Sequence, residues 1–269
     1  MTAAADGAVV LDLRYRSAGA FLVAYSAQLA KGELFVETPS PWPPGSGATL
    51  RLHVPGAPPL ETGATVSDVR AEALGPGQPA GMTLALAASL DAYGAVIDEL
   101  AARYDRIRIL LGTGEPAPRA IISRYLRSIL SCDLAEVNFQ PEGIGAGGRP
   151  AGANGAPAGL SGAAPEPPSP AESAAGSNAA MTASALDGPI DLVVVDLDSS
   201  GPAGDALVVR LRQEPATSLV PIIVLAQLER DRARGVDLGA DEALTNPPLY
   251  AELQSAVIHG LSRPQILGG

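Results

Sequence analysis

Cysteine, histidine and tryptophan are scarce in this chain of 269 residues, which holds one cysteine, two histidines and one tryptophan. A single cysteine, Cys132, cannot form an intramolecular disulfide, so the chain suits a reducing compartment. His53 and His259 are too few for most zinc sites. Cys132 lies between an apolar helical pattern and an apolar strand, which predicts a buried packing thiol.

Positive charge is also in short supply, because 18 Lys and Arg face 29 Asp and Glu and leave a formal net charge of −11. Nucleic acid and anionic membrane surfaces attract clustered basic residues, so neither is an expected partner. No apolar run approaches the ~20 residues that span a bilayer. The opening stretch MTAAADGAVV lacks the basic start and apolar core of a signal peptide. We therefore expect a soluble cytoplasmic protein.

The first part of the chain, residues 8–88, consists of short segments in which apolar and polar residues alternate. AVVLDLRYR, GELFVET and ATLRLHV have the period of half-buried strands, and stretches such as PSPWPPGSG separate them. SLDAYGAVIDELAARY then places its apolar residues on one helical face, with Ser89 at the N-cap. We predict that residues 8–104 form an all-β antiparallel barrel closed by a helix.

The second part alternates strands and helices. RIRILLG, LAEVNF, IDLVVVDL, VPIIVLA and EAL predict apolar strands, and helical patterns stand between them. This order is typical of a parallel sheet covered on both faces, so residues 105–263 are predicted to form a doubly wound, five-stranded α/β domain. Residues 140–189 are rich in Ala, Gly, Pro and Ser and contain no aromatic residue, which predicts a disordered insertion in this domain.

Three stretches of the second part resemble the receiver domain of bacterial response regulators. DLVVVDLDSS matches the segment around the family's phosphoacceptor and puts Asp196 at that position. GADEALTNPPL matches the fifth strand and its loop, and RIRILLGTGEP matches the first strand and its acidic pair. The resemblance implies a flavodoxin-like fold with a site at the carboxyl ends of the strands, where carboxylates hold Mg²⁺ beside the phosphoacceptor.

Most residues of that family site are replaced in this chain. The replacements concern the two metal-binding carboxylates, the reporting hydroxyl, the switch aromatic and the lysine, which correspond to Thr113, Gly114, Ala226, Ala243 and Asn246. Phosphoryl transfer depends almost wholly on positioning and charge stabilisation. We therefore expect a degenerate site in which Asp196 is the relic of a phosphoacceptor and no metal is held.

The first part resembles a PilZ domain, especially a variant of myxobacteria-like bacteria, through the stretch LRYRSAGAFLVAYSAQLAKGELFVETPSPWPPGSG. Many PilZ domains bind cyclic di-GMP with an RxxxR segment and a [DN]xSxxG turn. Here QLAKGE stands at the turn, with Gln28, Ala30 and Glu33 at the three defining positions, and no arginine precedes the strand. The resemblance therefore implies a degenerate nucleotide site.

Three basic residues could still contact a nucleotide at that site, namely Arg14, Arg16 and Lys31. Arg14 and Arg16 stand two apart in the first predicted strand, so their side chains are expected on the same face. A solvated face of the barrel is favoured over a ligand clamp.

These patterns favour a non-catalytic signalling adaptor that works through protein–protein contacts and needs no cofactor. Its expected partners are other signalling proteins or further copies of the chain, and the resemblances imply a pathway of bacterial motility or surface behaviour. Two alternatives stay open. The chain is either a regulator that binds cyclic di-GMP in an altered PilZ site, or a response regulator phosphorylated on Asp196 with Mg²⁺.

Overall fold

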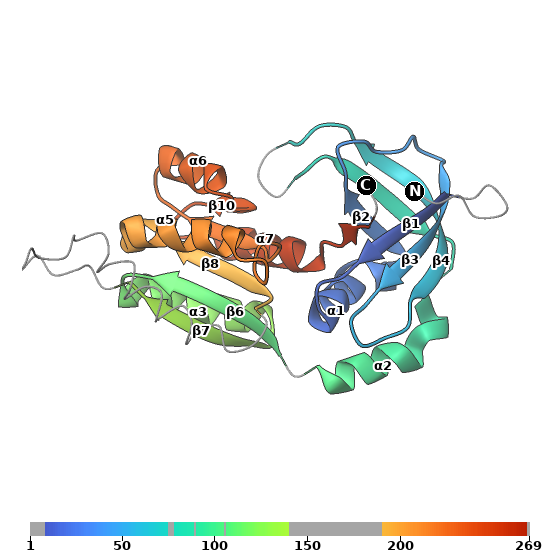
Figure 1. The fold of residues 1–269 in the computed structure, drawn as a ribbon, viewed down its shortest axis with the longest axis horizontal. Coiled ribbons are helices and arrows are strands. Elements are labelled where there is room, and N and C mark those ends of the chain that lie inside the picture. Colours follow the sequence, from blue (N-terminus) through green and yellow to red (C-terminus); the bar gives the residue numbers. More distant parts are fainter. Residues whose placement is uncertain (1–8, 75–77, 89, 105, 140–189, 268–269) are drawn as a thin grey trace, which may run out of the picture.

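The computed structural model describes residues 9–74, 78–88, 90–104, 106–139 and 190–267 (Figure 1). These residues form two sheets, one built mainly from the first part of the chain and one from the second. The predicted insertion at 140–189 and the predicted cap Ser89 lie outside the described residues.

The first sheet has six strands in the order β11-β1-β3-β4-β5-β2. Alternating burial follows the predicted period of two, most clearly in β4, where Leu60, Thr62, Ala64 and Val66 are buried and their neighbours exposed. The bounds of the strands are β1 Val9–Arg14, β2 Glu33–Glu37, β3 Gly47–His53, β4 Leu60–Arg70, β5 Gly81–Leu86 and β11 Gln265–Ile266.

The prediction of strands and turns alone in residues 8–88 is wrong, because helix α1 covers Ala18–Ala27. Its sequence AGAFLVAYSA does not alternate, and Ser17 caps it by accepting a hydrogen bond from the Ala20 N–H at 3.1 Å. The sheet is also not purely antiparallel, since β1 pairs with β3 in parallel. No pairing between β2 and β11 closes the described strands into the predicted barrel.

The predicted closing helix is present and packs on the first sheet. A 3₁₀ turn at Leu90–Tyr93 leads into α2 (Gly94–Arg103). Leu90, Ile97 and Leu100 are buried in the core that α1 and the first sheet share. The helical face that the sequence predicted is therefore the face that packs.

The second sheet confirms the predicted doubly wound fold. Its five strands are all parallel and run in the order β10-β9-β8-β6-β7, which corresponds to 5-4-3-1-2 along this part of the chain. The strands are β6 Ile107–Thr113, β7 Cys132–Asn138, β8 Leu192–Asp196, β9 Ile222–Leu225 and β10 Glu242–Leu244.

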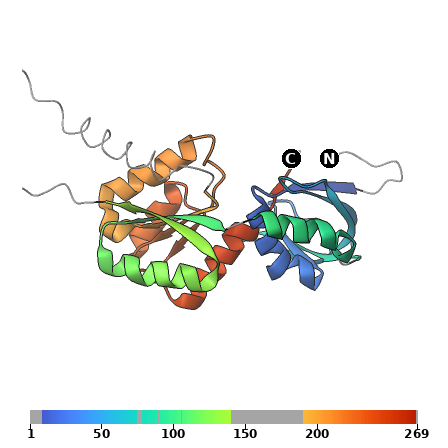
Figure 2. The same cartoon turned by 90° about the horizontal axis from the view of Figure 1, so that it is seen from below.

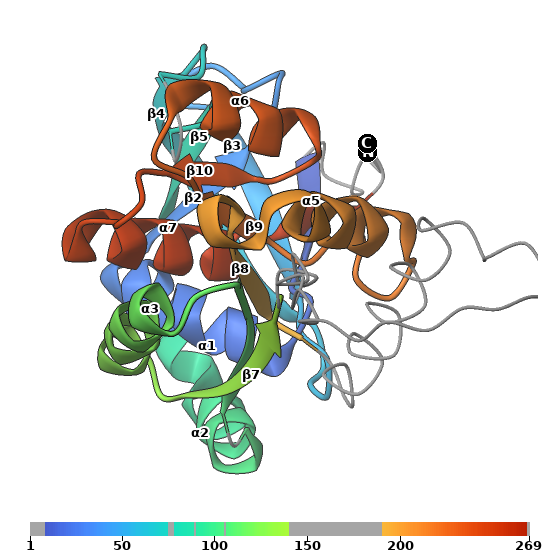
Figure 3. The same cartoon turned by 90° about the vertical axis from the view of Figure 1, so that its left-hand side faces the viewer.

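Helices cover both faces of this sheet. In Figure 3, α3 and α7 lie on one side of the sheet and α5 on the other, where α6 packs beside it. Central strand β8 is buried along its whole length, as its unbroken apolar run predicts. The helices are α3 Pro116–Ile129, α5 Leu197–Gln213, α6 Glu229–Asp237 and α7 Tyr250–Ser262.

Cys132 is buried at the start of β7, which confirms the predicted packing thiol. Burial raises the pKa of this thiol and so disfavours the reactive thiolate. Among the described residues, no helix combines the length and the apolar character that a membrane crossing requires.

The end of the chain joins the two sheets. Helix α7 packs against α1 and extends from the second sheet toward the first (Figure 2). The short strand β11 then pairs antiparallel with β1, where Leu13 lies opposite Ile266. Side chains support the same junction, since Gln28 Nε2 donates to Ser262 Oγ at 3.1 Å. The sequence did not predict this strand.

Candidate functional site

Asp196 is the last residue of β8 and the N-cap of α5, at the carboxyl edge of the parallel sheet. Doubly wound folds place their sites at this edge. The apolar run before it is held by two neighbouring strands, and the turn into α5 points the carboxylate at the loops that follow β6 and β10. The structure therefore places Asp196 at the strand end that the sequence predicted.

The carboxylate of Asp196 is fully buried and occupied by donors of its own chain. Oδ1 accepts hydrogen bonds from the backbone N–H groups of Asp198 at 3.1 Å and Ser199 at 3.3 Å. The amide Nδ2 of Asn246 also donates to Oδ1, at 2.8 Å. Oδ2 accepts from Ser199 Oγ at 2.7 Å. The two oxygens thus accept hydrogen bonds from the start of α5 and from the loop after β10.

Burial raises the pKa of Asp196, and the nearby charge of Asp198 acts in the same direction. The hydrogen bonds from Ser199 and from the Asp198 backbone oppose this rise because they stabilise the carboxylate. The net shift is upward, so the site favours the neutral acid more than water does.

Asn246 connects Asp196 with Asp198. Its Nδ2 donates to Asp198 Oδ2 at 3.0 Å as well as to Asp196, and the Gln227 N–H donates to the same Oδ2 at 2.8 Å. A neutral amide therefore bridges two carboxyl groups where the family resemblance implies a lysine. The amide supplies two hydrogen bonds and no positive charge.

Thr113 and Gly114, at the end of β6, come close to Asp196 through Ser199. The Gly114 N–H donates to Ser199 Oγ at 2.8 Å, and Thr113 is buried with its Oγ1 accepting from Arg119 Nε at 3.0 Å. A Cβ added at Gly114 would lie 1.8 Å from the Ser199 carbonyl oxygen. Glycine is thus required here, and no carboxylate fits at this position unless α5 moves.

Ala226 and Ala243 contribute no polar side chain to the edge. Ala226 follows β9 and Ala243 lies within β10, and both pack in the core shared with α5. Arg232 on α6 fixes the loop that begins at Ala226, because its guanidinium donates a hydrogen bond to the Ala226 carbonyl at 3.2 Å. In the part of the chain that the structure describes, no group of three or more His, Cys, Asp or Glu side chains could hold a metal ion.

The three basic residues expected near a nucleotide have different surroundings. Arg14 and Lys31 are exposed, Arg14 as the last residue of β1 and Lys31 in the 3₁₀ turn Leu29–Lys31. Arg16 lies two residues beyond the end of β1, outside the strand in which the sequence placed it.

Arg16 points to the second sheet instead. Its guanidinium donates to the Asp191 carbonyl at 3.3 Å and the Gly260 carbonyl at 3.4 Å. Burial is the largest influence on this group and lowers its pKa to about 10. The residue is therefore part of the junction between the two parts of the chain.

Sequence reasoning missed Asp191, which joins three segments at the amino edge of the second sheet. Its carboxylate accepts from Ser17 Oγ at 2.7 Å, Tyr104 Oη at 2.8 Å and the Arg108 N–H at 3.0 Å. The side chain is buried. A carboxylate directly before an unbroken apolar strand was the available signal, because a buried charge needs partners.

His259 was also missed, and it lies between the carboxylates of two sheets. Its Nδ1 is 2.7 Å from Glu242 Oε1 on β10, and its Nε2 is 3.2 Å from Glu37 Oε1 on β2. Burial alone would lower the pKa of His259, but hydrogen bonds and attraction from Glu242 and Glu37 outweigh it and raise the pKa to about 9. Arg263 adds ion pairs to Glu37 at 3.0 Å and Asp241 at 3.3 Å.

No protein family model matches the sequence. The phosphate regulon transcriptional regulatory protein PhoB of Rhizobium meliloti (strain 1021) is 38% identical over 81 residues, which cover 29% of this chain and 36% of that protein. The chain thus matches about a third of the length of this curated relative.

The similar solved structures include a putative response regulator from Chloroflexus aurantiacus J-10-fl, with 18% identity, a TM-score of 0.40, and coverage of 59% of this chain and 99% of that one. The receiver domain of sensor histidine kinase PA1611 from Pseudomonas aeruginosa PAO1 has 18% identity, a TM-score of 0.37, and coverage of 58% and 98%. Chemotaxis response regulator CheY4 of Vibrio cholerae has 13% identity, a TM-score of 0.38, and coverage of 56% and 96%.

The order of the parallel strands decides the fold of the second part. Counted along this part, the sheet reads 2-1-3-4-5 from β7 to β10, which is the flavodoxin-like and receiver order. The second part has a flavodoxin-like fold, which is the fold of receiver domains. The PilZ resemblance of the first part stays a prediction.

Proposed function

We propose that this protein is a non-catalytic signalling adaptor. In this proposal a receiver-fold domain over residues 105–263 keeps its architecture without phosphoryl transfer, and a PilZ-like domain over residues 8–104 is fixed against it. Both parts then act by presenting surfaces to other signalling proteins.

The occupied carboxylate of Asp196 is the observation that carries this proposal. A phosphoacceptor must offer a carboxylate oxygen to the incoming phosphorus, and both oxygens of Asp196 are already bonded to donors of α5 and Asn246. The residue is also fully buried. These contacts support a role as a helix cap that orders the carboxyl edge of the sheet.

The surroundings of Asp196 support the same conclusion. A phosphoryl group needs cations to offset its negative charge. The neutral Asn246 and Ala226 stand where the resemblance implies a lysine and a hydroxyl. Gly114 is in close contact with the Ser199 backbone, so a carboxylate for Mg²⁺ has no room there.

The role of Arg16 argues against the alternative of a cyclic di-GMP sensor. Of the three basic residues that could contact the nucleotide, this one donates to Asp191 and Gly260 across the junction. Arg14 and Lys31 then remain, and Lys31 offers a point charge without the planar, bidentate fork of a second arginine. We propose that the first part transmits or presents contacts and does not respond to this nucleotide.

Calorimetric titration tests the proposal against both alternatives. One sample receives cyclic di-GMP, and a second receives Mg²⁺ followed by beryllofluoride, which mimics an aspartyl phosphate. The adaptor proposal expects no heat of binding in either titration. Heat with beryllofluoride that Asp196→Asn abolishes would instead establish a phosphorylated regulator, and heat with the nucleotide that Arg14→Ala reduces would establish a sensor.

A further inference from the structure

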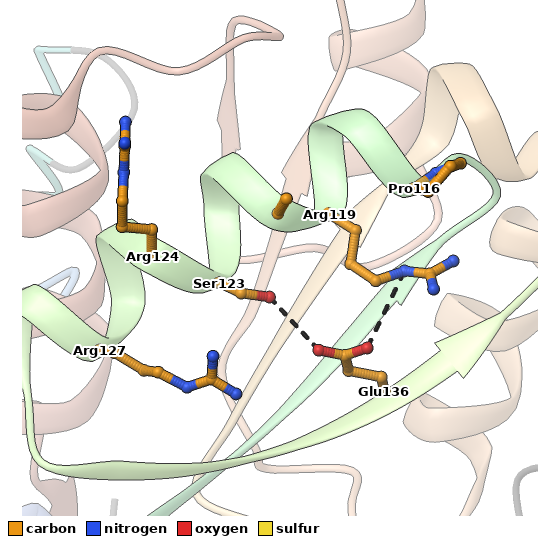
Figure 4. A pocket seen from close by; sticks show the side chains of 7 residues that line it. Pro116, Arg119, Ser123, Arg124, Arg127 and Glu136 are labelled. Atoms are coloured by element: carbon orange, nitrogen blue, oxygen red, sulfur yellow. Dashed lines mark hydrogen bonds and ion pairs between the residues drawn. The ribbon is translucent and has the colours of Figure 1, made fainter.

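A groove of about 460 Å³ lies between helix α3 and edge strand β7 (Figure 4). Its walls come from α3 and β7, and Arg119 reaches the carboxyl edge of the sheet by donating to Thr113. The groove is lined by Pro116, Arg119, Ala120, Ser123, Arg124, Arg127 and Glu136.

Two arginines of α3 make this groove basic. Arg119 and Arg127 extend from α3 toward Glu136 on β7, whereas Arg124 extends in the opposite direction (Figure 4). Arg119 Nε bonds to Thr113 and is 4.0 Å from Glu136 Oε2. No side chain among the described residues forms a hydrogen bond or ion pair with Arg127. The groove therefore carries excess positive charge on a chain whose net charge is −11.

The contacts of Glu136 within the chain are weak. Ser123 Oγ donates to its Oε1 at 3.4 Å, near the limit for a hydrogen bond, and Arg119 contacts it only at 4.0 Å. Better-placed carboxylates from outside the chain could therefore pair with both arginines. Glu136 would oppose its approach by repulsion.

Strand β7 is the last strand of the sheet, and within the described residues it pairs only with β6. The Ser131 carbonyl accepts from Ile107, and the Phe139 N–H donates to Thr113, so the odd-numbered residues direct their backbone groups to β6. The even-numbered residues therefore direct theirs outward, and these are Cys132, Leu134, Glu136 and Asn138. An exposed strand edge of this kind accepts a further strand.

We propose that the groove binds an extended acidic segment of a partner protein, which adds to β7 as a strand and places two carboxylates on Arg119 and Arg127. The two arginines are eight positions apart, or about 12 Å along the helix. Acidic side chains four positions apart in a strand span about 13 Å. Ser123 lies midway and can bond the side chain between them. This inference deepens the adaptor proposal by naming the chemistry of a partner.

Fluorescence anisotropy with a labelled synthetic peptide tests this proposal. The probe is a short peptide of alternating Thr and Val in which two glutamates stand about four positions apart, as the spacing of the arginines requires. Arg127→Ala is expected to weaken binding by about threefold and the double variant with Arg119→Ala by about tenfold. Glu136→Gln is expected to strengthen it, because a repulsive charge is removed.

Matched controls separate this site from general charge attraction. Arg230→Ala removes the same charge from exposed helix α6, which packs beside α5 on the other face of the sheet, and is expected to leave the affinity unchanged. A peptide with N-methylated backbone on its pairing side keeps the glutamates but loses the strand contacts, so it is expected to bind at least about tenfold more weakly. Circular dichroism confirms that each variant is folded.

Three results would overturn the inference. These are no binding to the wild-type protein, an Arg230→Ala effect equal to that of Arg127→Ala, and equal binding of the N-methylated peptide. The assay contains no phosphoryl donor, nucleotide or beryllofluoride. Its failure therefore leaves the adaptor proposal standing.

Discussion

At the scale of single residues, Asp196 decides how the molecule is understood. The sequence shows a carboxylate at the end of an apolar strand, and this is the position of a reactive group in a receiver. The structure shows what the strand end is used for: the carboxylate accepts from two backbone N–H groups of α5, from Ser199 and from Asn246. A carboxylate that caps a helix stabilises the fold, and this role involves no phosphoryl transfer.

Substitutions of Asp196 separate this capping role from a role that needs charge. Asp196→Ala removes the cap and leaves buried donors without an acceptor, so it is expected to lower the free energy of unfolding by about 1–2 kcal/mol. Asp196→Asn keeps an acceptor for the α5 backbone and removes a carboxyl whose pKa burial raises, so its loss is expected to be smaller. Urea denaturation at pH 7 measures both, and equal losses would argue against a cap.

Tyr15 offers a second test at this scale. Its ring is fully buried against Phe21, and none of the described residues bonds to its hydroxyl. Burial raises the pKa of this phenol. Tyr15→Phe removes a polar group that has no partner and is expected to raise the free energy of unfolding by up to about 1 kcal/mol. A decrease in thermal stability would indicate that the hydroxyl has a partner in solution.

At the scale of elements, periodicity predicted the strands and helices that bury one face. Strand β4 alternates and α2 packs the face that its apolar residues mark, while β8 is an unbroken apolar run and is central. Helix α1 was missed because it is apolar on nearly all sides, so no helical stripe appears in AGAFLVAYSA. It is buried on one side by the first sheet and on another by α7.

Pairing between distant segments was beyond the sequence as well. Strand β11 is two residues long and carries no signal of its own, and the contacts of Asp191 depend on Ser17 and Tyr104, far away along the chain. At the candidate site, the residues could be located but their hydrogen bonds could not. The amide of Asn246 and the close contact of Gly114 with Ser199 become visible only in three dimensions.

The packing of α1 on Tyr104 gives a prediction for this scale. A Cβ at Gly19 would lie 2.0 Å from the Tyr104 ring. The hydroxyl of the same tyrosine donates a hydrogen bond to Asp191. Gly19→Ala is therefore expected to lower the free energy of unfolding by about 1–3 kcal/mol through overpacking. Gly94→Ala in α2 is the control, because a Cβ at this position would meet no atom within 4 Å and helix propensity rises. Thermal denaturation of both variants checks the contrast.

At the scale of the whole molecule, the two sheets are joined by charged groups that belong to different parts of the chain. Glu37 from the first sheet contacts His259 and Arg263, and Asp191 from the second part contacts Ser17. Helix α7 and β11 add packing and strand pairing. These contacts hold the two sheets in a fixed relation.

The junction at His259 predicts a dependence of stability on pH. The raised pKa of about 9 means that protonated His259 stabilises the folded state fully below its unfolded pKa of about 6.5. This contribution, on the order of 3 kcal/mol, declines as pH rises from about 6.5 to 9. The difference in unfolding free energy between wild type and His259→Gln is expected to shrink over that range.

A matched variant controls for other groups that titrate in alkali. His53→Gln changes a histidine that pairs with Asp12 inside the first sheet, so the decline with pH is expected to persist in it. A constant difference between wild type and His259→Gln from about pH 6 to about pH 9.5 would contradict the role of this junction.

Intact-mass spectrometry after incubation with acetyl phosphate and Mg²⁺ tests the central claim most directly. If Asp196 is a buried cap, the mass of the protein stays unchanged, and Asp196→Asn behaves as the wild type does. A mass gain of one phosphoryl group that is present in the wild type and absent in Asp196→Asn would contradict the account and make the chain a working response regulator.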